Sequence, residues 1–233
     1  VHRRRGEANP DLSSLQGSGC ARHTRVETIV VDHPLVSSRL AVLRDRTTER
    51  AAFRSAVREV ARMLVYEALR DAKTQAVAVE TPLARAEGSV LAAPPFLVPI
   101  LRAGLGMMEA AQELVPDAPV GFVGLARDEQ THQPTAYLES LPDSFGGTPV
   151  LVLDPMLATG GSLQYCCRLL AQRNPAEITI VCILASPEGL EALRRSGLPA
   201  RVFTAAIDEH LDGSAFIVPG LGDAGDRQFG AVR

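Results

Sequence analysis

Short apolar runs alternate with stretches of helical periodicity over most of the chain beyond residue 95. The runs are rich in β-branched residues, which predicts buried strands. These strands are expected over residues 96–101, 119–126, 149–153, 177–184 and 200–207. One helix is expected after the turn at residues 102–106 and ends at about Leu114. A second is expected over about 161–173, and a third from a capping Ser186 through Arg195. The alternation predicts an α/β fold with a mostly parallel twisted sheet flanked by helices.

Two further helices are predicted nearer the N-terminus. Residues 35–45 carry apolar side chains at helical spacing, and a longer helix follows with Thr48 as its N-cap. The apolar stripe of the longer helix comprises Phe53, Val57, Val60, Ala61, Leu64 and Ala68. We expect this pair to pack on the sheet or on a second subunit. A polar turn region is expected after Pro82.

Three segments are expected to lie outside this core. Residues 1–25 lack periodicity, which predicts a flexible N-terminal arm ahead of a single domain over residues 26–233. Residues 127–134 are too polar to pack and form either a solvent loop or a hood over substrate, with a short strand over 135–141 returning from it. The last residues are expected to form a small irregular C-terminal flap.

Composition narrows the classes of function. The net charge of −3 gives no general field that would attract nucleic acid or an anionic membrane. The 4 cysteines and 5 histidines form no CxxC pair and no metal-ligand spacing, so we expect buried, reduced thiols. We find no apolar core of an export signal and no run of transmembrane length. We therefore expect a soluble cytoplasmic protein with no nucleic-acid or membrane partner.

The most informative segment is Val150-Leu-Val-Leu-Asp-Pro-Met-Leu-Ala-Thr-Gly-Gly-Ser162. It predicts a buried strand, a turn, and a helix N-terminus without bulky side chains. Such an end offers backbone N–H groups and the positive pole of a helix dipole to a phosphate. Asp154 is placed to meet a sugar hydroxyl or a magnesium-bound water. The alternative is a glycine-rich turn that only closes a βα unit.

Two other strand ends carry arginines. Arg102 opens a turn of small residues before a helix, and Arg127 follows the next strand. In a parallel sheet ligands bind outside the carboxyl ends of the strands, so both are expected to face the crevice that holds Asp154. Each arginine alone can equally be a solvated side chain.

The segment Pro219-Gly-Leu-Gly-Asp-Ala-Gly-Asp226 satisfies GxGxxG literally. The few residues after it leave no room for the helix, strand and distant acid of a dinucleotide fold. We expect instead a tight loop whose backbone lies against a flat nucleobase. Uracil offers two carbonyl acceptors that flank an N–H donor, an order that backbone groups of Ile217, Gly222 and Ala224 can match.

Together these motifs resemble the uracil phosphoribosyltransferases, which are type I phosphoribosyltransferases. The resemblance is carried by Pro99-Ile-Leu-Arg-Ala-Gly-Leu-Gly-Met-Met108, Asp154 through Ser162, and Pro219 through Asp226. It is strengthened by His33-Pro-Leu-Val36, Tyr66-Glu67, Ala185-Ser-Pro-Glu-Gly189 and Phe229-Gly230. Many other phosphoribosyltransferases have two adjacent acids at this point of the loop. The loop of the uracil phosphoribosyltransferases resembles Asp154-Pro155 instead.

The resemblance implies a role for each matching residue. Arg102, Arg127, Asp223 and the loop would bind phosphoribosyl diphosphate (PRPP). The loop residues are Asp154, Pro155, Met156, Leu157, Ala158, Thr159, Gly160, Gly161 and Ser162. Ile217, Gly222, Asp223 and Ala224 would bind uracil, and the catalytic residues would be Asp154, Asp223 and Arg127.

The implied reaction converts uracil and PRPP into UMP and diphosphate. Mg²⁺ would arrive on the PRPP diphosphate, without an identified direct protein ligand. The resemblance also implies a homodimer or a larger homo-oligomer, and GTP activates some relatives. The alternatives are a phosphoribosyltransferase for another base and a non-catalytic nucleotide sensor on the same fold.

Overall fold

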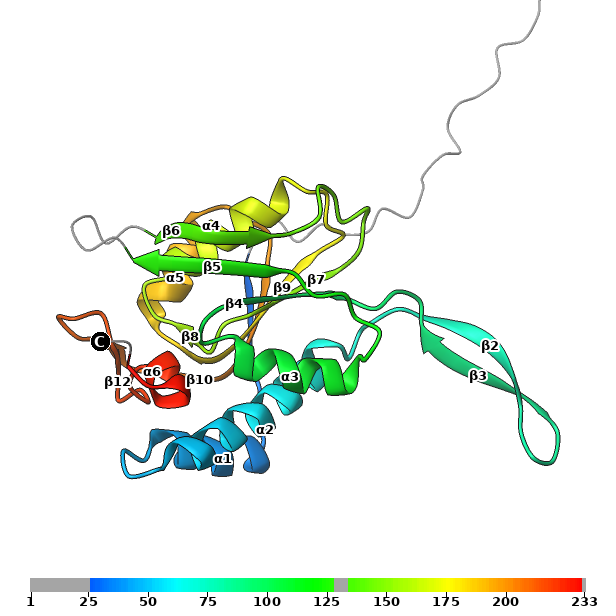
Figure 1. The fold of residues 1–233 in the computed structure, drawn as a ribbon, viewed down its shortest axis with the longest axis horizontal. Coiled ribbons are helices and arrows are strands. Elements are labelled where there is room, and N and C mark those ends of the chain that lie inside the picture. The colour runs from blue at the N-terminus through cyan, green and yellow to red at the C-terminus, as the bar shows by residue number, and fades with distance from the viewer. Residues whose placement is uncertain (1–25, 128–133, 232–233) are drawn as a thin grey trace, which may run out of the picture.

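In the computed structural model of the chain, residues 26–127 and 134–231 are described, and they form an α/β fold (Figure 1). The main sheet follows the order β1-β10-β9-β7-β4-β5-β6, and the short β8 pairs with β9. Its strands are β1 Glu27–Val30, β4 Phe96–Leu101, β5 Phe122–Arg127, β6 Pro134–Ser140, β7 Val150–Leu153, β8 Met156–Leu157, β9 Ile178–Ala185 and β10 Arg201–Ile207. All neighbouring pairs are parallel except β5 and β6. The predicted mostly parallel sheet is confirmed.

Helices cover both faces of this sheet. They are α1 Pro34–Arg44, α2 Arg50–Ala68, α3 Leu105–Leu114, α4 Gly161–Ala171 and α5 Pro187–Arg195. Successive strand residues point to opposite faces. In β7, Leu151 and Leu153 join the core beneath α1, α2 and α3, whereas Val150 and Val152 join the core beneath α4 and α5. The N-terminal helix pair thus packs on the sheet.

The predicted helix starts are partly correct. Ser186 caps α5 as expected, because its hydroxyl accepts a hydrogen bond from the Gly189 N–H at 2.9 Å. The prediction that Thr48 caps α2 is wrong. The Thr48 hydroxyl donates to the Val42 carbonyl at 2.7 Å, and Glu49 occupies the N-cap position without a side-chain hydrogen bond.

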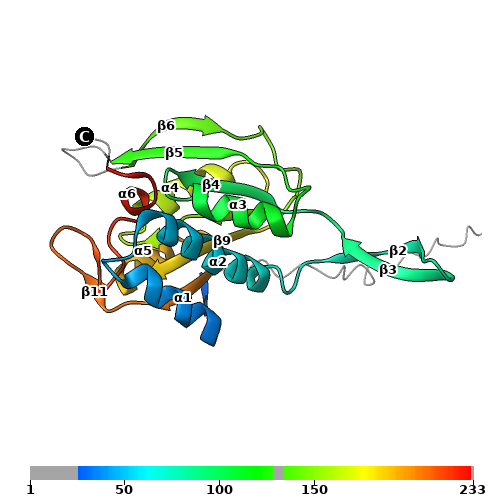
Figure 2. The same cartoon turned by 60° about the horizontal axis from the view of Figure 1, so that its bottom comes forward.

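A two-stranded hairpin extends away from the body of the molecule (Figure 2). It consists of β2, Thr74–Glu80, and β3, Arg85–Leu91, paired antiparallel in register Thr74 with Leu91. Sequence analysis identified only the polar turn after Pro82. The apolar side chains of these strands are mostly exposed, so no buried face produces the alternation that marks a strand in a sequence.

The C-terminal flap, residues 208–231, is more ordered than predicted. It contains β11, His210–Leu211, paired antiparallel with β12, Ile217–Val218, and then α6, Ala224–Phe229. Figure 1 shows α6 close to the carboxyl end of the sheet, beside the start of α3. The flap therefore stands where ligands bind in a parallel sheet.

Candidate active site

The segment 154–162, called the phosphate loop from here on, leaves the carboxyl end of β7. β9 continues past the end of β7 and pairs with β8 within the loop, Met156 opposite Leu184. Gly160 then adopts a φ of +79° as the N-cap of α4, which begins without a side-chain capping hydrogen bond. This is the predicted strand, turn and bare helix N-terminus, the arrangement that suits an anion.

Asp154 is 8% exposed and lies at the start of this loop. The Met156 N–H donates a hydrogen bond to Asp154 Oδ1 at 3.4 Å. Among the described residues, no other group donates to this carboxylate. Burial raises the pKa of Asp154 to about 7, and this hydrogen bond offsets the shift only in part. A carboxyl group with a pKa near neutrality is typical of a functional site.

The beginning of α5 contacts the backbone of the phosphate loop. The Ser186 hydroxyl donates to the Ala158 carbonyl at 2.7 Å. A Cβ on Gly189 would lie 2.2 Å from the same carbonyl oxygen, so the two backbones are in direct contact. Ser186 was predicted only as a helix cap, and its hydroxyl also fixes the loop.

The Arg102 turn, residues 102–104, lies against the phosphate loop. A Cβ on Gly104 would lie 2.3 Å from the Leu153 carbonyl oxygen, at the residue before Asp154. Arg102 itself is exposed at the end of β4. Two of the predicted sites are therefore neighbours in space, although about 50 residues separate them in the sequence.

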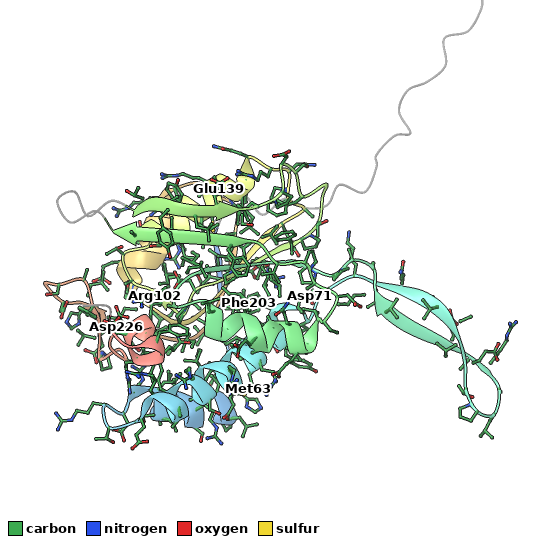
Figure 3. All side chains as sticks on the ribbon, viewed as in Figure 1. Met63, Asp71, Arg102, Glu139, Phe203 and Asp226 are labelled. Carbon is green, nitrogen blue, oxygen red and sulfur yellow. The ribbon has the colours of Figure 1, made fainter. Side chains whose placement is uncertain are left out.

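The same turn contacts the C-terminal flap. Arg102 Nη2 lies 3.2 Å from Asp226 Oδ1, and Figure 3 labels the two residues near each other beside α6. Gln228, fully buried, donates from Nε2 to the Ala103 carbonyl at 3.0 Å and to the Ala224 carbonyl at 2.9 Å. The Arg102 turn thus connects the phosphate loop to the flap.

The predicted uracil residues lie together in the flap. Ile217 is buried in β12, Gly222 has a φ of +77°, and Ala224 begins α6. Asp223 is the N-cap of α6, and its Oδ1 accepts a hydrogen bond from the Asp226 N–H at 2.8 Å. Asp223 as a whole is an exposed residue.

Arg127 ends β5, the strand beside β4, so its backbone lies at the same carboxyl edge as Arg102. The predicted hood at 128–133 lies outside the described residues, as does the predicted arm at 1–25. The predicted buried thiols are confirmed for Cys166, Cys167 and Cys182, and burial raises the pKa of each. Across the described ranges, no helix is long and apolar enough to cross a membrane.

Sequence analysis missed a polar cluster beneath the flap. Arg44 from the end of α1 forms an ion pair with Asp208, which directly follows β10. Arg44 also donates to the Gly220 carbonyl, and Asp208 accepts from the Gly220 N–H. The signal for Asp208 was its place at the carboxyl end of a predicted strand. No local pattern indicates Arg44, because its partner lies 164 residues away.

Comparisons with known proteins agree with this geometry. A sequence model of the uracil phosphoribosyltransferase family matches residues 30–231. Uracil phosphoribosyltransferases of Corynebacterium glutamicum (strain R) and Corynebacterium diphtheriae are each 53% identical over 205 residues, which is 88% of this chain and 97% of theirs. The solved structure of the AQ2163 protein from Aquifex aeolicus superposes with a TM-score of 0.83 at 36% identity, covering 87% of this chain and 98% of that one.

The family match spans the phosphate loop, the Arg102 turn and the flap, the three segments that the fold places side by side. The likeness predicted from the sequence motifs is thereby confirmed. The chain belongs to the uracil phosphoribosyltransferase family and is an enzyme with that activity.

Proposed function

We propose that the phosphate loop, the Arg102 turn and the flap hold PRPP and uracil together. Between these segments the phosphoribosyl group passes from PRPP to N1 of uracil, giving UMP and diphosphate. The observation that carries this proposal is the double contact of the Arg102 turn, with Leu153 on one side and with Asp226 and Gln228 on the other. The three segments are therefore neighbours, so their residues can contact both substrates.

The phosphate loop is proposed to hold the 5′-phosphate and the ribose. Backbone N–H groups at the start of α4 suit the phosphate, since no side chain caps them and Gly160 and Gly161 carry no bulky side chain there. Asp154 is proposed to accept hydrogen bonds from the ribose hydroxyls. Bringing a hydroxyl donor or a cation to this buried carboxylate favours its charged form and lowers its pKa.

Arg102 and Arg127 are proposed to bind the diphosphate of PRPP, because guanidinium groups pair with phosphate oxygens through charge-assisted hydrogen bonds. An Mg²⁺ ion is proposed to arrive on PRPP without an identified direct protein ligand. The carboxylates of Asp154 and Asp223 would suit the waters that this cation keeps. The ion would neutralise charge on the leaving diphosphate.

Uracil is proposed to lie against the backbone of Ile217 and residues 222–224. A pocket of this kind rejects cytosine, because exchanging a donor for an acceptor leaves buried polar groups unpaired. Positive charge develops on the ribose as diphosphate leaves and N1 attacks. Alignment of the two substrates and electrostatic stabilisation then supply most of the acceleration. Backbone hydrogen bonds that stabilise the uracil anion would assist the loss of the N1 proton.

We infer that the protein forms a homodimer or a larger homo-oligomer. A two-stranded hairpin is marginally stable alone in water. The hairpin of β2 and β3 nevertheless extends from the body with Val79, Leu83 and Val90 exposed, which suits a second copy as its cover. Val79→Glu with Val90→Glu should convert the assembly to monomers in sedimentation velocity. An assembly unchanged in size would show that the hairpin is not the interface.

Three further inferences rest on the sequence. Residues 26–233 form the catalytic domain, with 1–25 as a dispensable arm, and the protein acts in the cytoplasm. GTP is a candidate effector by family resemblance. Deletion of residues 1–25 should leave kcat and KM unchanged, whereas an inactive truncation would make the arm part of the enzyme. Adding GTP to the assay tests the effector directly.

The proposed reaction is tested by mixing the enzyme with PRPP, Mg²⁺ and each of uracil, cytosine, hypoxanthine and orotate. We expect UMP and diphosphate with uracil, and a preference over cytosine of about 10⁴ or more. Equal rates with a purine would favour a transferase for another base. Tight, salt-dependent RNA binding without release of diphosphate would favour the sensor.

A further inference from the structure

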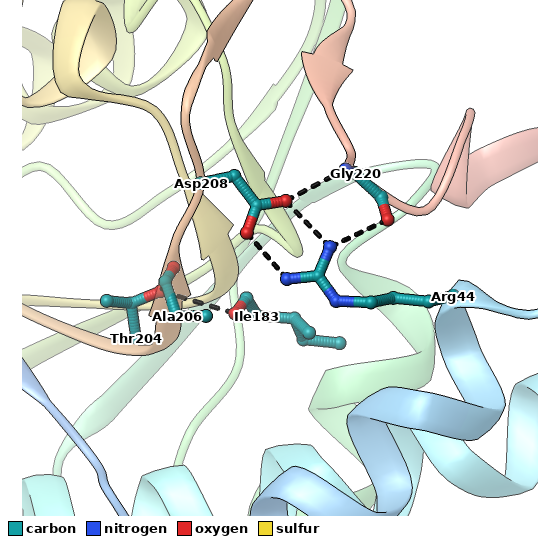
Figure 4. Close-up of polar contacts among 6 residues, drawn as sticks. All are labelled: Arg44, Ile183, Thr204, Ala206, Asp208 and Gly220. Carbon is teal, nitrogen blue, oxygen red and sulfur yellow. Dashed lines mark hydrogen bonds and ion pairs between the residues drawn. The ribbon is translucent and has the colours of Figure 1, made fainter.

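We propose that Arg44 and Asp208 are positioning residues for uracil, acting through the backbone of Gly220. Figure 4 shows their contacts. Arg44 Nη1 lies 2.7 Å from Asp208 Oδ2, and Nη2 lies 2.5 Å from Oδ1, so the guanidinium grips the carboxylate with two parallel hydrogen bonds. This inference rests on the proposed place of uracil in the flap.

The pair holds both polar groups of one flap residue. The Gly220 N–H donates to Asp208 Oδ2 at 2.8 Å, and the Gly220 carbonyl accepts from Arg44 Nη1 at 2.9 Å. Gly220 lies between Ile217 and Gly222, the two sides of the proposed uracil site. Holding the N–H and the carbonyl of Gly220 therefore fixes the spacing of the backbone groups that are proposed to face the base.

The turn at Gly220 is tight, and this residue has no side chain of its own to anchor the backbone. Its φ is +62°, and a Cβ there would lie 2.0 Å from the Ile217 carbonyl oxygen. Hydrogen bonds with Arg44 and Asp208, a polar clamp, hold this backbone, while the neighbouring Ile217 and Leu221 side chains pack into the core. Because Asp208 and Gly220 are both buried, the charge-assisted hydrogen bonds are shielded from water.

The clamp is itself anchored to the sheet and to α1. The Asp208 N–H donates to the Ala185 carbonyl at 2.9 Å, at the end of β9. Just before it, the Thr204 hydroxyl lies within hydrogen-bond distance of the Ile183 and Ala206 carbonyls, at 3.2 and 3.0 Å. The carboxylate is thus held by the central sheet.

A second arginine also connects the flap to the end of α1. Arg227 of α6 donates to the carbonyls of Leu43 and Asp45, the residues on either side of Arg44, and to the Leu221 carbonyl at 2.8 Å. Its guanidinium carbon lies 4.2 Å from the centre of the Phe53 ring. Arg44 and Arg227 together fasten the flap to the end of α1.

The strength of the clamp depends on both charges. The Asp208 side chain is 4% exposed and that of Arg44 is 27% exposed. Removing one partner of a buried ion pair leaves the other charge uncompensated. Arg44→Met strands the buried carboxylate, Asp208→Asn removes its charge, and Arg44→Lys keeps the positive charge but loses the two-pronged grip.

The test compares these three variants with wild type in steady-state kinetics, varying uracil and PRPP separately. We expect Arg44→Met and Asp208→Asn to raise the KM for uracil about tenfold or more, with the KM for PRPP within about twofold. Arg44→Lys should recover part of the loss. The matched control is Arg39→Met. Arg39 lies on α1, as Arg44 does, and its exposed ion pair is with Glu59 of α2, so its loss should change neither constant.

Equal changes in both KM values would overturn the proposal, since they indicate a general effect on the fold. An unchanged KM for uracil would also overturn it, and so would loss of the cooperative thermal transition in all three variants. Wild-type enzyme that fails to convert uracil would instead overturn the proposed function, so the two failures are distinguishable.

Discussion

Arg102 Nη2 lies 3.2 Å from Asp226 Oδ1 and joins the proposed diphosphate site to the flap that is proposed to hold uracil. Both side chains are more than 40% exposed, so the pair itself contributes at most about 1 kcal/mol to stability. The pair matters because Arg102 must break its contact with Asp226 in order to bind a diphosphate. The ion pair and the substrate compete for one guanidinium.

Asp226→Asn should therefore favour PRPP. Freed from its carboxylate partner, Arg102 pays less to turn to the diphosphate, and the KM for PRPP should fall by up to about fivefold. Arg102→Ala should raise the same KM and lower kcat. Initial rates at saturating uracil measure both effects. A higher KM for PRPP in Asp226→Asn would mean that Asp226 assists the substrate instead of competing with it.

Asp154→Asn should lower turnover sharply while the fold stays intact. The amide keeps the size of the side chain, but it cannot offer two anionic oxygens to the ribose or to a cation. We expect a fall in kcat of about 100-fold or more. Circular dichroism checks the fold in parallel. Wild-type kinetics for this variant would exclude Asp154 from the site.

The same substitution should stabilise the protein at neutral and alkaline pH. The ordinary pKa of an aspartate is 3.8, and burial raises that of Asp154 to about 7 in the folded state. The folded state thus holds this proton more tightly than the unfolded state. Wild-type stability from this group is greatest below pH ~4 and is lost as pH rises toward ~7.

The expected advantage of Asp154→Asn above pH ~7 is on the order of 4 kcal/mol, from about three pKa units. It should shrink toward zero near pH 4. Denaturant unfolding at pH 4, 6 and 8 measures this dependence. An advantage that is constant across this range would contradict the pKa and its cause.

Gly104→Ala should damage the enzyme through its contact with β7. The added Cβ would lie 2.3 Å from the Leu153 carbonyl oxygen, so the Arg102 turn must move away from the phosphate loop. We expect a loss of about 3 kcal/mol in unfolding free energy and a large loss of activity. The matched control is Gly213→Ala in the flap, where nothing lies within 4 Å of the new Cβ. Equal stability of the two variants would contradict the close approach.

Residues that act through local pattern could be predicted from the sequence. The apolar run of β7 and the glycines after it identified the phosphate loop, and the carboxyl-end rule placed Arg102 and the backbone of Arg127 at the same edge of the sheet. Ser186 was found as a helix cap because its hydroxyl binds a backbone N–H three residues away. In each case the interaction that matters is local, or the strand order alone decides it.

Features that depend on long-range contacts were missed. β1 is four residues long and the hairpin strands bury no full face, so neither shows a period that separates strand from loop. The Arg44–Asp208 clamp joins residues that only the folded sheet brings together. Thr48 was predicted to cap the helix after it, but its hydroxyl instead donates a hydrogen bond to the Val42 carbonyl of the preceding helix.

A crystal structure of the enzyme with bound UMP tests the central claim most directly. We predict the 5′-phosphate against the backbone of residues 158–162, the ribose beside Asp154, and the base against Ile217 and residues 222–224. UMP bound with its base away from the flap, or at another face of the sheet, would contradict the account.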